Sequence, residues 1–124
     1  MIIGIGSDIV EHKLTEALKW DKDNDVIERI FSKGELKLYE AKANLSFLAG
    51  RFAGKEAVLK CLKIGMQDGI SLSEIEILED SSGAPFIFMS NSMRGISENL
   101  KIKYWHISIS HTSSCSIAFV IAES

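Results

Sequence analysis

The most informative segment of this 124-residue chain is Arg51-Phe52-Ala53-Gly54-Lys55-Glu56-Ala57-Val58-Leu59-Lys60. Its apolar residues fall on nearly every side of a helix, so such a helix needs cover all round. We expect it to begin near Asn44–Ser46 and to run to about Lys63, with Gly65 as its terminator. The stretch therefore predicts a long helix at the centre of the fold.

The charges of this helix form two rows. Arg51 and Lys55 stand four residues apart on one face, where like charges repel by a few tenths of a kcal/mol, and an anion between them would reverse that penalty. Glu56 and Lys60 form a second row, about 140° around the helix. A solvated face with one routine ion pair is the alternative reading. One compact ligand cannot easily touch both rows from a single subunit, whereas a long anionic ligand or a neighbouring chain can.

The remaining chain predicts short helices and antiparallel hairpins. Met1–Ile9 is apolar with two glycines and predicts a strand that ends near Asp8. Ser32 and Glu35 have the spacing of a capping box, which marks a helix start. Further elements are expected as helices within 14–20, 26–31 and 93–100 and as hairpins over 74–89 and 105–122. This pattern predicts an α+β fold, one domain over 1–124, with an antiparallel sheet packed against the long helix.

Composition narrows the functional class. The chain is 46% hydrophobic, as a packed core requires, and its formal charge of −3 disfavours general binding to nucleic acid. No apolar run is long enough to span a membrane, and the N-terminus does not resemble a secretory signal. Cys61 and Cys115 are expected to be free thiols in a reducing compartment. We therefore expect a cytoplasmic protein.

The N-terminal segment Gly4-Ile5-Gly6-Ser7-Asp8 has two readings. It lacks the third glycine of a dinucleotide fingerprint, and no lysine follows as in a phosphate-binding loop. The glycines are expected to let other backbone approach the strand closely. Asp8 either caps the following helix or is a ligand of a hard metal such as Mg²⁺, which often takes only one or two carboxylates from protein.

The segment Ser108-Ile109-Ser110-His111-Thr112 lies at the tip of the last predicted hairpin. Its hydroxyls, imidazole and turn amides suit a phosphate, and ordinary turn chemistry is the alternative, because Ser and Thr bond their own backbone in turns. A nucleophilic triad is disfavoured, since no Gly-x-Ser-x-Gly elbow is present.

Taken together, three segments resemble a known family. They are Gly4-Ile5-Gly6-Ser7-Asp8-Ile9-Val10-Glu11, Arg51–Lys60 and Ile107-Ser108-Ile109-Ser110-His111-Thr112. In order, spacing and total chain length they resemble the motifs of the holo-[acyl-carrier-protein] synthases, the small single-domain branch of the 4′-phosphopantetheinyl transferases. Each motif alone is weak, but three in register are specific.

The resemblance implies transfer of the phosphopantetheine arm of coenzyme A to a serine of apo-acyl carrier protein, with release of adenosine 3′,5′-bisphosphate. It also implies a place in fatty acid biosynthesis, a Mg²⁺ cofactor, and a homotrimer with sites between subunits. Asp8 and Glu56 match the family's metal carboxylates, and Lys60 matches a catalytic lysine that would stabilise the leaving phosphate. The serine proton would pass to a metal-bound water or to Glu56. The positions that match coenzyme A contacts are Arg51, Lys55, Ser110, His111 and Thr112.

One departure from the family pattern affects carrier recognition. The family usually has an arginine in the first helix, where this chain has His12, Lys13 and Leu14. Lys13 keeps a charge but lacks the bidentate fork of arginine. An acidic carrier then needs a local basic patch, for which Lys13, Lys19 and Arg51 are candidates.

Two other function classes stay open. A non-catalytic module that binds coenzyme A, a nucleotide or a carrier protein would have less need of the Asp8–Glu56 pair. A metal-dependent phosphodiesterase would need more clustered carboxylates than these two, because two-metal sites use bridging ligands.

Overall fold

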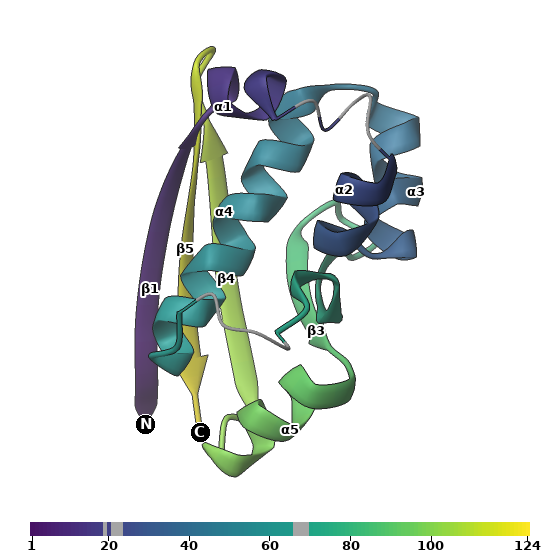
Figure 1. The fold of residues 1–124 in the computed structure, drawn as a ribbon. Helices are drawn as coiled ribbons and strands as arrows, with labels where there is room; N and C mark the ends of the chain where they lie inside the picture. The colour runs from purple at the N-terminus through teal and green to yellow at the C-terminus, as the bar shows by residue number, and fades with distance from the viewer. Residues whose placement is uncertain (19, 21–23, 66–69) are drawn as a thin grey trace.

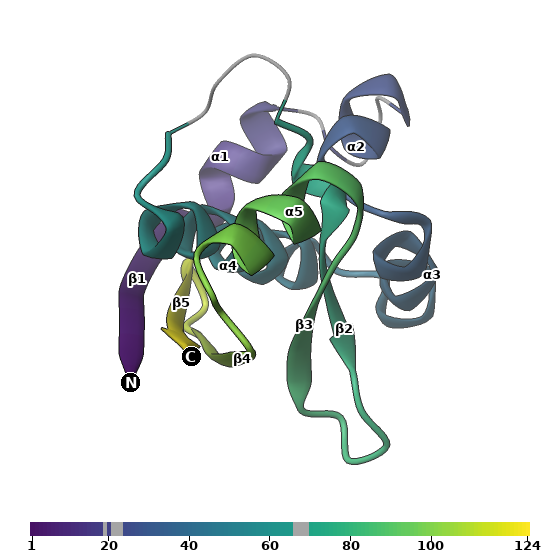
Figure 2. The same cartoon turned by 90° about the horizontal axis from the view of Figure 1, so that it is seen from below.

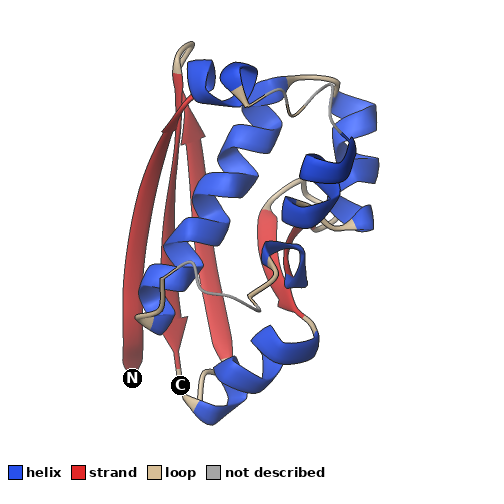
Figure 3. Ribbon diagram, viewed as in Figure 1, coloured by secondary structure: helices blue, strands red, loops and turns tan. Residues whose placement is uncertain are grey.

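The computed structural model describes residues 1–18, 20, 24–65 and 70–124 and has an α+β architecture (Figures 1 and 3). The strands are β1 (Ile2–Glu11), β2 (Ile75–Glu79), β3 (Pro85–Met89), β4 (Tyr104–His111) and β5 (Cys115–Glu123). The helices are α1 (His12–Ala17), α2 (Asn24–Ile30), α3 (Lys33–Lys42), α4 (Leu45–Leu62), the 3₁₀ turn η1 (Leu72–Glu74) and α5 (Asn91–Asn99). One antiparallel sheet has the strand order β1-β5-β4, and β2 and β3 pair separately. The expected fold class and both expected hairpins are confirmed.

Helix α4 lies along one face of the three-stranded sheet (Figure 1). Two glycines of β1 allow this close packing. A Cβ atom on Gly6 would lie 2.1 Å from the carbonyl oxygen of Ala57, and one on Gly4 would lie 2.4 Å from that of Cys61. Since no side chain fits at such distances, the predicted close approach of other backbone to this strand is confirmed.

Helix α3 and the β2–β3 hairpin also pack against α4, and Figure 2 shows the hairpin beside β4 with α3 beyond it. Helix α4 begins at Asn44, whose side chain accepts a hydrogen bond from the backbone N–H of Phe47 at 2.9 Å. As its all-round apolar pattern predicts, most of its residues are buried: Phe47, Leu48, Ala49, Gly50, Arg51, Ala53, Gly54, Lys55, Ala57, Val58, Leu59, Cys61 and Leu62.

Strand β1 runs further than expected. It continues past Asp8 to Glu11, and Asp8 pairs in the ladder with Ala118 of β5. The N-cap of α1 is Glu11, whose side chain makes no capping hydrogen bond. The alternative that Asp8 caps the following helix is therefore wrong, because the sheet ladder holds the backbone extended beyond it.

Two other details differ from expectation. Helix α4 ends at Leu62, close to the expected end near Lys63, but its left-handed cap is Lys63 at φ 59° rather than Gly65. Strand β4 includes Ser110 and His111, since the ladder with β5 extends to the pairing of His111 with Ser116. Alternation along the strand puts Ser110 and His111 on opposite faces of the sheet, so the expected five-residue tip is not one cluster.

On the face of the sheet turned away from α4, β1 and β5 carry a group of apolar side chains. By alternation along the two strands this face carries Ile5, Ile9, Ile117, Phe119 and Ile121, which we call the outer face. Three of these side chains are strongly exposed in the single chain: Ile5 at 67%, Ile9 at 63% and Phe119 at 52%. Contiguous exposed apolar patches of this kind mark interaction surfaces.

The cysteines are free thiols, as expected. Cys61 is buried beside β5, and burial raises the pKa of its thiol to about 11. The thiol is therefore protonated at neutral pH and a poor nucleophile. In the part of the chain that the structure describes, no helix has both the length and the apolar character needed to cross a membrane.

Candidate active site

Strand β1 and helix α4 bring three of the predicted catalytic residues together. Asp8 comes from β1, and Glu56 and Lys60 lie one turn apart on α4. The Lys60 Nζ donates to the carbonyl oxygen of Ser7 at 2.7 Å and lies 3.4 Å from Asp8 Oδ1. Their side chains are 55% and 21% exposed, so this acid–lysine cluster opens to solvent. An adjoining cavity of about 320 Å³ is lined by Ile5, Gly6, Ser7, Lys60 and Phe119.

The electrostatics of the acid–lysine cluster favour an added cation. The pKa of Glu56 is raised, first by burial and then by the negative charge of Asp8, while Lys60 opposes the shift. Two carboxylates thus share one ammonium group. No group of three or more metal-ligating side chains occurs among residues 1–18, 20, 24–65 and 70–124. A pair of carboxylates is nevertheless a donor set that fits Mg²⁺, which commonly completes its coordination with water and substrate phosphates.

Arg51 lies on the opposite row of α4 and is only 6% exposed. Its Nε donates to the carbonyl oxygen of Ile77 at 3.2 Å, and its guanidinium lies 4.2 Å from the ring centroid of Phe47. Its Nη2 lies 3.6 Å from Glu79 Oε1 and makes no hydrogen bond with the residues that the structure describes. Burial lowers the pKa of Arg51, and Glu79 and Glu35 oppose that shift. One guanidinium nitrogen is therefore buried without a hydrogen bond to the described residues.

A cavity of about 300 Å³ opens beside Arg51, and we call it the anion pocket. Three of its lining groups carry or can carry positive charge: Lys42 of α3, Arg51 of α4 and His111 of β4. Lys42 Nζ lies 3.1 Å from Glu79 Oε1. Charge-assisted donors arranged in this way suit a phosphate. The remaining lining residues are Asn44, Ser46, Phe47, Glu79, Gly83, Pro85 and Ile109.

Lys55 occupies a different environment from the one expected for a ligand contact. It is fully buried, and its Nζ donates to Glu35 Oε1 at 2.7 Å, to Leu72 O at 2.9 Å and to Ile75 O. An ammonium group has three protons, so these acceptors satisfy it. Burial lowers the pKa of Lys55, and Glu35 opposes the shift. The structure does not support a contact between Lys55 and coenzyme A.

The anion expected between Arg51 and Lys55 is therefore supplied by the protein itself. Glu35 is fully buried, accepts from Lys55, and also accepts from the backbone N–H groups of Ser32 at 2.9 Å and Ile77 at 3.1 Å. The capping box of Ser32 and Glu35 is confirmed. Its local sequence pattern contained no sign that the same carboxylate also binds a lysine on α4.

The other predicted contacts are scattered. Ser110 is exposed on the outer side of β4, away from His111. The Thr112 Oγ1 accepts from the backbone N–H groups of Ser114 at 3.2 Å and Cys115 at 2.9 Å, which is the turn chemistry given as the alternative. Neither residue lines the anion pocket.

The basic patch expected for an acidic carrier is smaller than the sequence predicts. Lys13 is exposed on α1, and Lys19 lies outside the described residues. Arg51 is buried on α4 and cannot extend a surface around Lys13. Lys13 is therefore the member of the predicted patch that the structure places at the surface.

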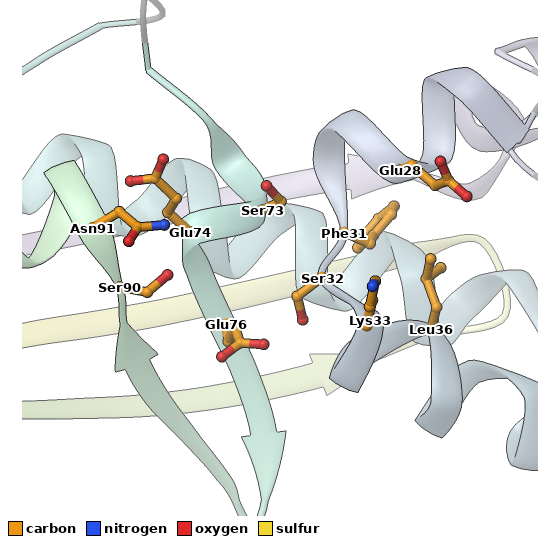
Figure 4. Close-up of a pocket in the computed structure, with 10 residues that line it drawn as sticks. All are labelled: Glu28, Phe31, Ser32, Lys33, Leu36, Ser73, Glu74, Glu76, Ser90 and Asn91. Carbon is orange, nitrogen blue, oxygen red and sulfur yellow. The ribbon is translucent and has the colours of Figure 1, made fainter.

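A separate cavity of about 520 Å³ contains none of the predicted site residues (Figure 4). It is lined by Glu28, Phe31, Ser32, Lys33, Leu36, Ser73, Glu74, Glu76, Ser90 and Asn91. Much of its polar surface already has partners. Ser32 is part of the α3 capping box, and Glu74 Oε1 accepts from Ser92 Oγ at 2.7 Å and from the N–H of Met93 at 3.2 Å.

Comparison with known proteins shows the family of the chain. The profile of the 4′-phosphopantetheinyl transferase superfamily matches residues 4–120. The holo-[acyl-carrier-protein] synthase of Blochmanniella pennsylvanica is 38% identical over 99% of both chains, and that of Alkaliphilus oremlandii is 39% identical over 98% of this chain and 99% of its own.

Solved structures give the same result. The holo-[acyl-carrier-protein] synthase of Neisseria meningitidis superposes with a TM-score of 0.90 at 32% identity over all of both chains. That of Helicobacter pylori, solved in complex with coenzyme A, superposes with a TM-score of 0.84 at 32% identity over 96% of this chain and 99% of its own. Since the profile, these relatives and the shared fold all point to one family, the chain belongs to the 4′-phosphopantetheinyl transferase superfamily.

Proposed function

We propose that this chain transfers the 4′-phosphopantetheine arm of coenzyme A to a serine of apo-acyl carrier protein and releases adenosine 3′,5′-bisphosphate. The observation that carries the proposal is the meeting of Asp8 from β1 with Glu56 and Lys60 from α4. The relatives named holo-[acyl-carrier-protein] synthase, and the one solved with coenzyme A, support the same reaction. The enzyme acts as one cytoplasmic domain over 1–124.

Asp8 and Glu56 would hold Mg²⁺, which when bound neutralises charge on the pyrophosphate of coenzyme A. Asp8 is fixed by the β1–β5 ladder, and Glu56 is fixed by the packed helix α4, so both carboxylates are oriented before the substrate arrives. Lys60 has a half-exposed ammonium group that binds an oxygen of the leaving phosphate. Positioned charges of this kind supply much of the rate in phosphoryl transfer.

The anion pocket binds a second phosphate of coenzyme A. Arg51 offers the guanidinium nitrogen that lacks a hydrogen bond in the described structure, and Lys42 and His111 lie around the same cavity. Coenzyme A carries a ribose phosphate separate from its pyrophosphate, so two separated cationic sites suit one molecule. Because the two sites occupy different sides of α4, a single coenzyme A bridges them between neighbouring subunits.

The subunits assemble as a homotrimer through the outer face. Covering each large apolar side chain there contributes about 1.5–3 kcal/mol. Ile9→Asp should therefore reduce the mass measured by sedimentation from that of a trimer to that of a monomer. Leu100→Asp is the matched control, because Leu100 is 40% exposed but lies beyond α5, away from the outer face. An unchanged mass for Ile9→Asp would contradict this assembly.

The carrier protein binds near α1, where Lys13 supplies a positive charge for an acidic partner. A point charge gives steering rather than bidentate recognition. Carrier binding should accordingly weaken as salt is added.

The test of the reaction is mass spectrometry of apo-acyl carrier protein incubated with the enzyme, coenzyme A and Mg²⁺. The expected result is a gain of one phosphopantetheine arm, absent when coenzyme A is omitted and reduced when Mg²⁺ is chelated. Binding of coenzyme A without any mass gain on several carrier proteins would instead identify a non-catalytic binding module.

A further inference from the structure

A buried serine joins two histidines near the anion pocket. Ser116 of β5 is fully buried, and its Oγ lies 2.6 Å from Nδ1 of His111 and 2.8 Å from Nε2 of His12. Its Oγ also lies 3.4 Å from the carbonyl oxygen of Ser46, near the start of α4. The three residues come from α1, β4 and β5, so the network links the first helix to the wall of the anion pocket.

The number of protons available limits which hydrogen bonds this network can make. A serine hydroxyl has one proton to donate and can accept two hydrogen bonds. If both imidazoles presented lone pairs to Ser116, only one of them could receive a proton. If both were cationic, two positive rings would face one oxygen, and its proton could go only to the distant Ser46 carbonyl. The arrangement therefore favours one imidazole that donates to Ser116 and one that accepts from it.

The geometry also fixes the His111 ring. Its Nδ1 is held by Ser116, and its Cε1 lies so near Gly50 of α4 that a Cβ atom there would approach it to 2.7 Å. Within the described structure, Nε2 of His111 has no hydrogen-bond partner. The ring is therefore held from one side, and Nε2 is the nitrogen left for a ligand.

We infer that Ser116 and His12 are positioning residues for His111: Ser116 holds its Nδ1, His12 holds Ser116 from the other side, and Nε2 is left free for the phosphate in the anion pocket. This inference rests on the proposed function, since it assumes that the pocket binds a phosphate of coenzyme A. When His111 gains a proton, its Nδ1–H donates to Ser116, and the hydroxyl donates in turn to His12 Nε2.

The charges around His111 explain why such a relay is needed. Burial lowers the pKa of His111, and His12 of α1 and Arg51 of α4 act in the same direction because they disfavour a further positive charge. Lys42 of α3 lies at the same pocket, and Glu79 of β2 is its acidic neighbour. An incoming phosphate adds negative charge at Nε2 and offsets this repulsion.

The first test measures binding of adenosine 3′,5′-bisphosphate by calorimetry to the full chain. Ser116→Ala should weaken binding roughly three- to tenfold, because the ring loses its hydrogen-bonded anchor. His12→Gln should bind within about twofold of the wild type, since the glutamine amide oxygen can still accept the hydrogen bond from Ser116. Ser97→Ala is the matched control: it removes another buried hydroxyl, the acceptor for Trp105, far from the pocket. Wild-type affinity in Ser116→Ala would overturn the inference.

The second test follows the ring protons of the three histidines, His12, His106 and His111, by NMR titration of the free protein. His12→Gln should raise the pKa of His111, because a group that can carry a like charge is gone. Ser116→Ala should also change the His111 titration, whereas Ser97→Ala should leave it unmoved even if it lowers stability equally. A His111 titration indifferent to both Ser116→Ala and His12→Gln would refute the network.

These tests separate the inference from the proposed function. If the wild type binds no nucleotide, the proposed function fails, while inorganic phosphate as the probe and the NMR titration still decide whether Ser116 and His12 govern His111. If Ser116→Ala is too unstable to measure, Ser116→Cys replaces it, because a thiol is a much weaker hydrogen-bonding group than a hydroxyl. The same weakening and the same altered titration are expected, and wild-type behaviour would again overturn the inference.

Discussion

Lys55 and Glu56 are neighbours in the sequence and opposites in their environment. Lys55 is fully buried, and each of its ammonium protons has an acceptor within the protein. Glu56 is half-buried beside Asp8, with a raised pKa and one lysine to offset two carboxylates. One step along α4 thus separates a charge that the fold has neutralised from a charge left for a ligand.

The difference shows how to distinguish structural charges from functional ones on a single helix. Both rows of α4 look alike in the sequence, because each has two charged residues four apart. In the structure, the row with Lys55 faces Glu35 and Glu79, whereas the row with Glu56 faces the open edge of β1. Arg51 is intermediate, since it is buried and partly paired yet keeps one donor without a hydrogen bond among the described residues.

The largest expected effect comes from removing a charge in the row of Glu56 and Lys60, which we call the open row because it faces solvent. Glu56→Gln keeps the shape of the side chain but removes a metal carboxylate, and it should lower the rate of carrier modification at least about 100-fold. Asp8→Asn should do the same. The measurement is the mass-spectrometric rate at limiting Mg²⁺, with the unfolding curve recorded alongside. Glu40→Gln, at an exposed position of α3, is the control and should keep the wild-type rate. Near-normal turnover in Glu56→Gln would mean that the metal assignment is wrong.

Removing a charge from the row of Arg51 and Lys55, which we call the closed row because it is buried, should lower the free energy of unfolding instead. Lys55→Met leaves Glu35 buried without its cation, and loss of one partner of a buried pair costs about 3–5 kcal/mol. Urea unfolding should show this loss as a lower midpoint. The double variant Lys55→Met with Glu35→Gln should recover part of it, because the remaining amide carries no charge but still accepts a hydrogen bond. An unchanged midpoint in Lys55→Met would show that the pair does not stabilise the fold.

The sequence predicts the framework of this molecule well because local patterns determine it. Apolar residues on all sides of α4 predict a buried central helix, and the glycines of β1 indicate where that helix packs on the sheet. The capping box at Ser32 is a contact between residues three apart, so the sequence shows both partners. Each of these features depends on spacing within one segment.

The sequence fails where partners are distant along the chain. The bond between Lys55 and Glu35 joins residues 20 apart, and the bond between His12 and Ser116 joins residues 104 apart. No period or spacing records such pairs. Ser110 shows another failure, because its polar neighbours suggest a turn while the ladder between β4 and β5 keeps it in a strand facing away from His111.

A smaller effect is expected at Arg51, which belongs to the closed row but borders the anion pocket. Arg51→Ala should raise the KM for coenzyme A roughly tenfold, as loss of a charge-assisted hydrogen bond does, and should lower kcat much less. Some loss of stability should accompany it, because the stacking on Phe47 and the bond to Ile77 are lost. Steady-state kinetics with coenzyme A varied at saturating carrier separates the two constants. A drop in kcat at unchanged KM would move Arg51 from binding to the chemical step.

The smallest expected effect is on the stability of the metal-free protein, to which Glu56 of the open row contributes. Since burial and Asp8 raise the pKa of Glu56 above its unfolded value, its ionised form destabilises the folded protein. The stability that this group contributes is fully present below the unfolded pKa and is lost as pH rises through the raised folded pKa. Glu56→Gln should therefore be more stable than the metal-free wild type at pH 7, and the gain should vanish as pH falls below the unfolded value.

Thermal unfolding of both proteins across that pH range, with a chelator present, measures this difference. Adding Mg²⁺ at pH 7 should stabilise the wild type, because a bound cation favours the ionised carboxylates of Asp8 and Glu56. It should leave Glu56→Gln little changed, because this variant has lost one of the two carboxylates. Lys55→Met should show no such gain at any pH, since it leaves Glu35 buried without its cation. If Glu56→Gln is no more stable than the wild type at pH 7, then Lys60 alone balances the two carboxylates, and the open row has no charge left over for a metal.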